Sequence, residues 1–228
     1  YKKDGLFGIY DKSGDVLKNN DLENKFVYGE LKDDKVVVKE NGVLFGIDFI
    51  GGQKTGFFID QRDNRLLFSK YCNRKRILNA FCYSGGFSVY GLLYGAEHVT
   101  SIDSSPKAME MLEVNIELNN LNKNNQDAIK GDVVDFLSNN EKSYDIIIID
   151  PPAYAKHIDS RHNAVKGYKR LNKLALDRLN KGGFLFTFSC SQVVNRQLFT
   201  NTVISATIQS GRDVKIIHQL SQPVDHPI

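Results

Sequence analysis

The sequence predicts an α/β protein whose mostly parallel, doubly wound sheet is preceded by a small β-rich segment. From residue 75 onward, short apolar runs alternate with longer amphipathic stretches, the pattern of a parallel sheet with helices on both faces. Before residue 60, Asn41-Gly42 separates two apolar runs, which is typical of a β-hairpin. We therefore expect a β-rich segment over 1–60, part of a central linking domain, and a second domain over 61–228.

The composition is that of an ordinary globular chain. Of 228 residues, 41% are hydrophobic and 25% are charged, which argues against disorder. A net charge of +3 permits a nucleic-acid partner without requiring one. The spacing of Cys72, Cys82 and Cys190 fits neither a metal site nor a disulfide framework, so we expect no metal and a reducing, cytoplasmic location. No membrane-spanning run or secretory signal is visible, and because the chain starts on Tyr1 we expect a fragment of a longer protein.

The expected elements follow one another along the chain. The hairpin joins 36–38 to 43–49, the polar stretch 12–25 forms a surface loop, and a helix covers 63–71. Strands are then expected at 76–81, 98–103, 126–131, 145–150, 183–189 and 214–219. Helices are expected at 86–94, 105–120, 133–140, 164–180 and 193–210. Ser104 or Ser105 can cap the second of these helices, and Gly182-Gly183 ends the helix before the fifth strand.

A glycine turn, Tyr83 to Gly86, links the strand at 76–81 to its helix. Asp103 ends the next strand, 18 residues beyond Gly85. In a parallel βαβ unit this spacing places the turn and the carboxylate side by side, where a nucleoside fits and its ribose diol donates to the carboxylate. Because the third glycine of G-x-G-x-x-G is missing, the turn favours S-adenosylmethionine and leaves NAD, or a purely structural turn, as alternatives.

Two further acids end strands at the same edge. Asp132 follows the third strand and either hydrogen-bonds the amine of adenine, caps the next helix, or does both. Asp150 follows a buried isoleucine run and precedes Pro151-Pro152, a stiff loop suited to holding a planar base, with Tyr154 placed to stack on it. The alternative, a strand stop made with prolines, does not explain the carboxylate.

Cys190 ends the fifth strand. If the fourth and fifth strands are neighbours, its thiol lies beside Asp150, so that a nucleophile and a carboxylate flank one pocket. A cysteine taken alone is more often a small core residue, and reactivity requires thiolate character. Cys72 and Cys82 lack this context and are interpreted as structural, and His157 is interpreted as a surface histidine.

Basic residues gather on one side of the helix that begins near residue 164. A basic face is most often only solvated, but beside a base pocket it can contact phosphates. The residues are Arg161, His162, Lys166, Lys169, Arg170 and Lys173.

Six separated motifs stand in a recognisable order: Asn41-Gly42-Val43, Gly52 to Arg62, Tyr83 to Phe87, Asp150-Pro151-Pro152, Gly167-Tyr168 and Phe188 to Ser191. From about residue 25 to the end, the chain resembles the PUA-domain class of bacterial S-adenosylmethionine-dependent 23S ribosomal RNA methyltransferases. The cytosine-5 branch is the most similar, because a cysteine follows Phe188-Ser189. By this resemblance, a PUA domain before residue 1 and a final strand after Pro227 are expected outside the chain.

The resemblance implies the Rossmann-like fold of class I methyltransferases and S-adenosylmethionine as cofactor. It implies that Cys190 is the nucleophile and Asp150 a second catalytic residue. It implies that the cofactor is held by the stretch from Lys54 to Arg62 and the strand ends, in particular by Thr55, Phe57, Gln61, Arg62, Phe81, Tyr83, Ser84, Gly85, Gly86, Asp103, Ser104, Asp132, Val133, Asp150 and Pro152. The RNA and its target base would contact Pro151, Pro152, Tyr154, Lys166, Lys169 and Arg170. Ala153 stands where two-cysteine enzymes carry a second cysteine, so the group that assists enzyme release is unassigned.

The expected reaction is methyl transfer to cytosine carbon 5 through a covalent adduct. Cys190 adds to carbon 6, Asp150 stabilises charge at nitrogen 3, and carbon 5 then attacks the sulfonium methyl. The expected partner is free 23S rRNA with its target base splayed out, and dimers in the family leave a homodimer open. Guanine-N7 transfer without a thiol, a non-catalytic RNA-binding module and an NAD-dependent oxidoreductase stand as alternatives.

Overall fold

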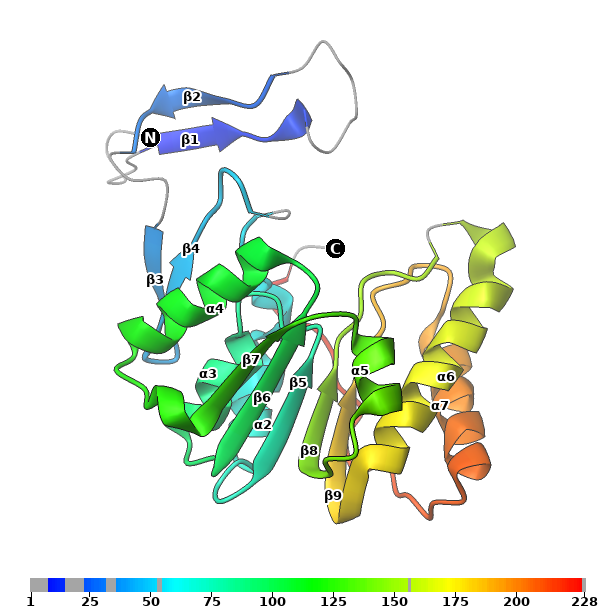
Figure 1. The fold of residues 1–228 in the computed structure, drawn as a ribbon. Coiled ribbons are helices and arrows are strands. Elements are labelled where there is room, and N and C mark those ends of the chain that lie inside the picture. Colours follow the sequence, from blue (N-terminus) through cyan, green and yellow to red (C-terminus); the bar gives the residue numbers. More distant parts are fainter. Residues whose placement is uncertain (1–7, 15–22, 32–35, 53–54, 156, 227–228) are drawn as a thin grey trace.

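A five-stranded parallel sheet forms the centre of the computed structural model, which describes residues 8–14, 23–31, 36–52, 55–155 and 157–226 (Figure 1). The strand order is β7-β6-β5-β8-β9. These strands are β5 (Arg76–Ala80), β6 (His98–Asp103), β7 (Gln126–Lys130), β8 (Tyr144–Ile149) and β9 (Leu179–Thr187). The chain builds β5, β6 and β7 outward and then returns to the other side of β5, so the order reverses between β5 and β8. This confirms the predicted parallel sheet and places its switch point, where ligands bind in such folds.

Helices cover both faces of the sheet, as predicted (Figure 1). One face carries α2 (Arg62–Ser69), α3 (Gly86–Leu93) and α4 (Pro106–Leu118), and the other carries α5 (Val133–Asn139), α6 (Arg161–Arg178) and α7 (Arg196–Ser210). Alternate residues of one strand serve the two cores: Ile146 packs with the first helix group and Ile147 with the second. Short 3₁₀ turns lie at η2 (Ile59–Gln61), η3 (Lys123–Asn125) and η4 (Ile158–Ser160).

Side-chain caps fix where the helices behind the strand ends begin. Ser105 caps α4, because its hydroxyl accepts a hydrogen bond from the Ala108 amide at 3.2 Å, and Pro106 follows at a position that tolerates proline. Asp132 caps α5 by accepting from the Asp135 amide at 2.9 Å. Each cap comes directly after a strand and its loop, so the two helices start at the carboxyl edge of the sheet.

The hairpin predicted around Asn41-Gly42 is present. β3 (Val36–Glu40) pairs antiparallel with β4 (Val43–Ile47), and both turn residues have positive φ, 50° and 87°, as a two-residue hairpin turn requires. The hairpin is fastened to α4, since the Asn115 and Asn119 side chains accept from the Gly46 and Leu44 amides at 2.8 and 3.0 Å. It shares a hydrophobic cluster with the sheet. The division of the chain near residue 60 stays a prediction.

Three expectations about secondary structure need correction. First, a hairpin of β1 (Gly8–Asp11) and β2 (Lys25–Gly29) was not predicted. Lys25, which was predicted to lie in the polar loop, begins β2. Residues 15–22 of that predicted loop lie outside the described residues. α6 ends at Arg178, so Gly182-Gly183 lies inside β9, where Gly182 has a φ of 77° beside an irregular register with β8.

The third correction concerns the sixth strand predicted at 214–219. The structure has no strand there, although the residue pattern suits one. β-propensity describes a fit to a half-buried, hydrogen-bonded surface, and among the described residues β9 pairs only with β8. Val214, Ile216 and Ile217 are about half exposed, while the His218 ring nitrogen lies 2.7 Å from the Tyr71 hydroxyl. The segment is therefore held by side-chain contacts rather than by a ladder.

Candidate active site

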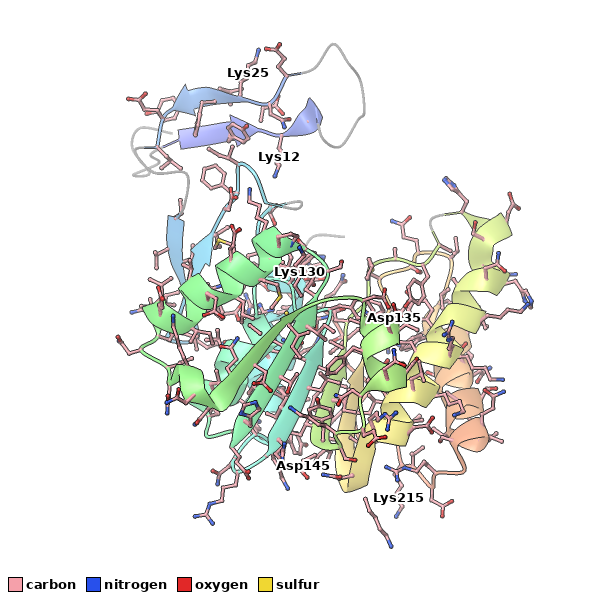
Figure 2. All side chains as sticks on the ribbon, viewed as in Figure 1. Lys12, Lys25, Lys130, Asp135, Asp145 and Lys215 are labelled. Atoms are coloured by element: carbon pink, nitrogen blue, oxygen red, sulfur yellow. The ribbon has the colours of Figure 1, made fainter. Side chains whose placement is uncertain are left out.

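The loops that follow the strands at the carboxyl edge of the sheet line one part of a large cleft, which continues along β9 and the segment 211–222. Figure 2 shows the two ends of the sheet: Lys130 closes β7 at this edge, and Asp145, near the start of β8, lies at the opposite one. The cleft is lined by residues that follow β5, β6, β8 and β9, including Phe81 to Ser84, Asp103 to Ser105, Asp150 to Ala155 and Phe188 to Cys190. The sheet therefore brings together the strand-end residues that the sequence singled out.

The glycine turn has an unusual backbone. Phe81, Tyr83 and Gly85 have φ values of 59°, 48° and 79°, so three residues out of five adopt the left-handed conformation, two of them with side chains. At Gly85 a Cβ would lie 2.1 Å from a Leu112 methyl group of α4, and at Gly86 it would lie 3.2 Å from the Arg65 side chain. Gly85 is therefore favoured both by its left-handed backbone and by packing against Leu112, whereas a side chain at Gly86 would require Arg65 to move by a few tenths of an ångström.

Asp103 joins the glycine turn to the start of α4. One of its carboxylate oxygens accepts from the Tyr83 amide and the other from the Ser105 amide, both at 2.9 Å. A carboxylate has about four acceptor positions, so a diol can still donate to it. The neighbouring Cys82 is buried, and burial followed by the Asp103 charge raises the pKa of its thiol well above the ordinary value. This supports the structural interpretation of Cys82.

At the end of β7, Asp132 both caps α5 and lines the cleft, so both interpretations of this residue remain compatible. Ser104 also lines the cleft. Val133 does not, because its side chain packs in the core between the sheet and α5. A contact between Val133 and a cofactor would have to use its backbone.

The segment from Thr55 to Arg62 lies over the glycine turn. The Tyr83 hydroxyl donates to the Gly56 carbonyl at 3.4 Å, and the rings of Phe58 and Tyr83 meet edge to face at 5.1 Å. Lys54, at the start of the implied binding stretch, lies outside the described residues. The segment is thus placed to close one side of the cofactor crevice.

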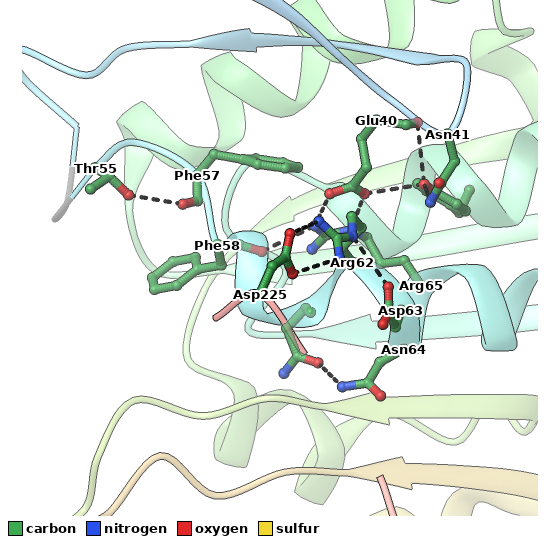
Figure 3. A network of polar contacts seen from close by, with 12 residues as sticks. Glu40, Asn41, Thr55, Phe57, Phe58, Arg62, Asp63, Asn64, Arg65 and Asp225 are labelled. Carbon is green, nitrogen blue, oxygen red and sulfur yellow. Dashed lines mark hydrogen bonds and ion pairs between the residues drawn. The ribbon is translucent and has the colours of Figure 1, made fainter. Parts of the chain in front are cut away.

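Four residues of this segment were predicted to bind the cofactor: Thr55, Phe57, Gln61 and Arg62. Their surroundings differ, and Figure 3 labels Thr55, Phe57 and Arg62. The Thr55 hydroxyl donates to the Phe57 carbonyl, and the Phe57 ring is buried against Phe45 and the Arg65 guanidinium. Arg62 forms an exposed, bidentate ion pair with Asp225 at 2.8 Å. Gln61 turns inward and donates to Asp150 at 3.0 Å. Of the four, the cleft is lined by Phe57 and Gln61.

Cys190 and Asp150 follow the carboxyl ends of adjacent strands. β8 and β9 are neighbours that pair in parallel, which is the arrangement that a pocket flanked by Cys190 and Asp150 requires. The Cys190 thiol donates to the Pro151 carbonyl at 3.5 Å, directly beside Asp150 in the chain. Cys190 is exposed and lines the cleft, whereas Cys72 is fully buried and burial raises the pKa of its thiol. Of the three cysteines, Cys190 alone is exposed.

A buried bridge ties the Pro-Pro loop to the cysteine loop. The Ser191 hydroxyl accepts from the Ala155 amide at 3.4 Å and lies 2.8 Å from the Tyr168 hydroxyl of α6. Tyr154 packs on Tyr168, with ring centroids 4.8 Å apart, and also on Gly167, and its burial raises the pKa of Tyr154 to about 12. The motifs that contain Gly167, Tyr168 and Ser191 did not predict this bridge. No local sequence pattern indicates that residues 168 and 191 are in contact.

The basic residues chosen for RNA contact lie on α6, outside the cleft. Lys166 and Arg170 are exposed and Lys169 is half-buried. The Arg170 charge is near enough to Tyr154 to act on its pKa, which places this side chain toward the Pro-Pro loop. Lys173, from the same basic face, forms an ion pair with Asp177 at 2.6 Å.

Within the described ranges, no cluster of His, Cys, Asp or Glu side chains could hold a metal ion. In the same ranges, none of the helices combines the length and apolar character needed to cross a membrane.

The fold and the site define a class of protein: a doubly wound α/β domain with a nucleoside crevice at its switch point and a thiol beside it. A sequence model of the S-adenosylmethionine-dependent methyltransferase family matches residues 18–227. The chain belongs to that family. Membership decides between the two cofactors that the glycine turn allowed, in favour of S-adenosylmethionine.

Known relatives share the whole of this region. The chain is 42% identical to the ribosomal RNA large subunit methyltransferase I of Aeromonas salmonicida over 226 residues, and 37% identical to that of Escherichia coli. These alignments cover 96% of the chain and 57% of each relative, so the chain spans a little over half of their length. Among solved structures, the protein SMU.776 in complex with SAH superposes with a TM-score of 0.79 at 25% identity, covering 89% of this chain and 53% of the other.

Proposed function

We propose that this chain carries the catalytic domain of an enzyme that forms 5-methylcytosine in 23S rRNA through a covalent Cys190 adduct. The observation that carries the proposal is the placement of Cys190 beside Asp150 and Pro151 at the cofactor crevice. The relatives named as ribosomal RNA methyltransferases point to the same substrate.

The residues present suit the cofactor. Asp103 is fixed by two backbone amides and keeps acceptor capacity for a ribose diol, and the turn at Phe81 to Gly86, with its left-handed backbone, would hold the methionine part. Asp132 and Ser104 line the same cleft, where Asp132 would contact the adenine. When bound, S-adenosylmethionine supplies an electrophilic methyl group on its sulfonium.

The thiol solves the problem that carbon 5 of cytosine is a poor nucleophile. The Cys190 thiolate forms a bond to carbon 6 as the carbon 5–carbon 6 π bond opens, and the displaced electron pair moves to nitrogen 3. Nitrogen 3 takes a proton that Asp150 carries and returns it to Asp150 once carbon 5 has been methylated. Carbon 5 becomes enamine-like and takes the methyl group as the carbon–sulfur bond of the donor breaks. Removal of the carbon 5 proton by a base then returns the electrons that break the Cys190–carbon 6 bond. Orientation and electrostatics are the protein's contribution.

The target base must leave its stack to reach this cleft, which favours free 23S rRNA in the cytoplasm over the assembled particle. Pro151, Pro152 and Tyr154 would form the wall that receives the base. Lys166, Lys169 and Arg170 would contact the phosphates of the flanking RNA.

The test is methyl transfer from labelled S-adenosylmethionine into undermethylated 23S rRNA by the full-length protein, with nucleoside mass analysis. We expect 5-methylcytidine, and a loss of at least about 10³-fold in rate for Cys190→Ala, because the covalent route disappears. Cys72→Ala is the matched control, since it removes a buried thiol outside the cleft.

Covalent trapping on RNA that contains 5-fluorocytidine at the target adds a second readout, because the adduct cannot lose fluorine from carbon 5. Methylated guanosine without trapping would replace the proposal with guanine-N7 transfer. Failure of S-adenosylmethionine to bind in calorimetric titration would leave a non-catalytic RNA-binding module.

A further inference from the structure

A chain of two amide side chains runs from helix α2 to the carboxylate of Asp150. The Asn64 side-chain amide donates to the Gln61 side-chain oxygen at 2.7 Å. The Gln61 side-chain nitrogen in turn donates to Asp150 at 3.0 Å. Gln61 and Asn64 are only 8% and 7% exposed, and both line the cleft. The contact joins residues 89 positions apart in the sequence.

The direction of these hydrogen bonds is fixed by chemistry. An amide side chain offers one oxygen that accepts and one nitrogen that donates. Because Asn64 donates to the oxygen of Gln61, the nitrogen of Gln61 must face Asp150. The opposite orientation of Gln61 would set its oxygen against a carboxylate oxygen, which is repulsive. Asn64 therefore selects the rotamer in which Gln61 holds Asp150.

Arg65, the neighbouring residue on α2, belongs to a hydrogen-bond network with a purely structural role. Arg65 is buried and is satisfied by Glu40 and the Phe58 carbonyl, with Tyr90 completing the group (Figure 3). Arg65 also lines the cleft, but its network ends on Glu40, which does not. The network of Asn64 instead ends on a carboxylate that lines the cleft beside Cys190.

We propose that Gln61 and Asn64 are positioning residues, which set the orientation of the Asp150 carboxylate toward the target base, instead of binding the methionine end of the cofactor. The proposal rests on the proposed function, since it needs Asp150 to act on the base. A neutral amide suits this role, because Gln61 fixes the geometry of the carboxylate without adding a full positive charge.

The test is Asn64→Asp in the full-length protein, a change at a residue that reaches Asp150 through Gln61. The introduced carboxylate has no amide to donate, so Gln61 turns its nitrogen toward that carboxylate and its oxygen toward Asp150. We expect trapping on 5-fluorocytidine RNA at saturating cofactor to slow about 10–100-fold, the range for loss of a hydrogen bond to a charged group. The dissociation constant for S-adenosylmethionine should stay within about threefold of wild type.

Two companion variants keep the result interpretable. Gln61→Met removes the bond without adding a charge and should slow trapping in the same direction by a smaller factor. Asn201→Asp is the matched control, because Asn201 is exposed on α7 and its side-chain oxygen already accepts from Gln197, so an aspartate keeps that bond. Asn201→Asp should leave the trapping rate, the cofactor affinity and Tm unchanged.

The outcomes separate this inference from the proposed function. A rise in the dissociation constant for S-adenosylmethionine with unchanged trapping at saturation would assign Gln61 to the cofactor and overturn the inference, as would a wild-type rate in Asn64→Asp. If the wild-type protein does not trap, the proposed function fails. The ratio of single-turnover methyl-transfer rates between Asn64→Asp and wild type then decides the role of Gln61 for whichever nucleoside is methylated.

Discussion

The two halves of the cleft are built by different means. The cofactor half, which comprises the turn at Phe81 to Gly86 with Asp103, is shaped by backbone conformation and by amides that donate to one carboxylate. The reaction half, which comprises Asp150 to Ala155 and Ser189 to Ser191, is held by side chains that reach across the fold from Gln61 and Tyr168.

The difference matters for what a substitution will do. In the cofactor half, the glycines and the buried Arg65 beneath them determine whether the crevice forms at all. In the reaction half, single hydrogen bonds adjust the orientation of groups in a crevice that already exists. Variants of the first half should change stability or cofactor affinity, and variants of the second should change the chemical step.

The largest effect is expected for Arg65→Met. It leaves the Glu40 carboxylate buried without the partner that lies 2.6 Å away. We expect the free energy of unfolding to fall by about 3–5 kcal/mol, because an uncompensated buried charge is costly. Urea unfolding measures the loss, and the double variant Arg65→Met with Glu40→Met should recover most of it. A single variant as stable as wild type would show that this pair does not support the cofactor half.

The next effect concerns Gly85→Ala. The residue combines a φ of 79° with a Cβ position 2.1 Å from Leu112, so we expect a loss of about 2–4 kcal/mol in unfolding and a weakened affinity for S-adenosylmethionine. Gly211→Ala is the matched control, because Gly211 has a φ of 65° and open space around its Cβ position. It should cost about 1 kcal/mol, from backbone strain alone. Equal losses in the two variants would contradict a packing role for Gly85.

Asp103→Asn tests the cofactor half without a change of volume. Calorimetry should show the affinity for S-adenosylmethionine reduced about 10–100-fold, because charge-assisted hydrogen bonds to the ribose are lost. Trapping at saturating cofactor should remain close to wild type. Asp127→Asn, on β7 and paired with His98 at 3.1 Å, is the control and should leave the affinity unchanged. Normal affinity in Asp103→Asn would remove this residue from the cofactor site.

The smallest effect, and the one that separates the halves most cleanly, is expected for Tyr168→Phe. Losing the hydroxyl that contacts Ser191 should slow trapping by about 3–10-fold, the value of one neutral hydrogen bond, with unchanged affinity for S-adenosylmethionine. Tyr144→Phe is the control: it also loses a hydrogen bond, to Asn140, but at the opposite end of the sheet. Tyr144→Phe should lower the free energy of unfolding slightly and leave the trapping rate unchanged. If both variants slow trapping equally, the bridge through Ser191 has no specific role.

One predicted strand is absent, and two adjacent site residues have different surroundings, for reasons that local pattern cannot reveal. The segment 214–219 has the composition of a strand, but a strand also needs a hydrogen-bonding neighbour, which the sequence of the segment does not specify. Arg62 and Gln61 are adjacent in one motif, yet Arg62 pairs with Asp225 on the surface while Gln61 turns into the cleft. Neighbouring residues at a helix start point in different directions, so a motif assigns them a shared role too readily.

Between residues 76 and 210, the alternation of strands and helices, the glycine turn and the strand-end residues Asp103, Asp150 and Cys190 could all be predicted from the sequence. This was possible because periodicity and turn chemistry are local, and because parallel strands must end at one edge. The pairing of β8 with β9, the hydrogen bond from Gln61 to Asp150 and the bridge from Ser191 to Ala155 and Tyr168 became visible in the folded chain. These contacts depend on how helices pack on the two faces of the sheet, and that packing brings together residues far apart in the chain.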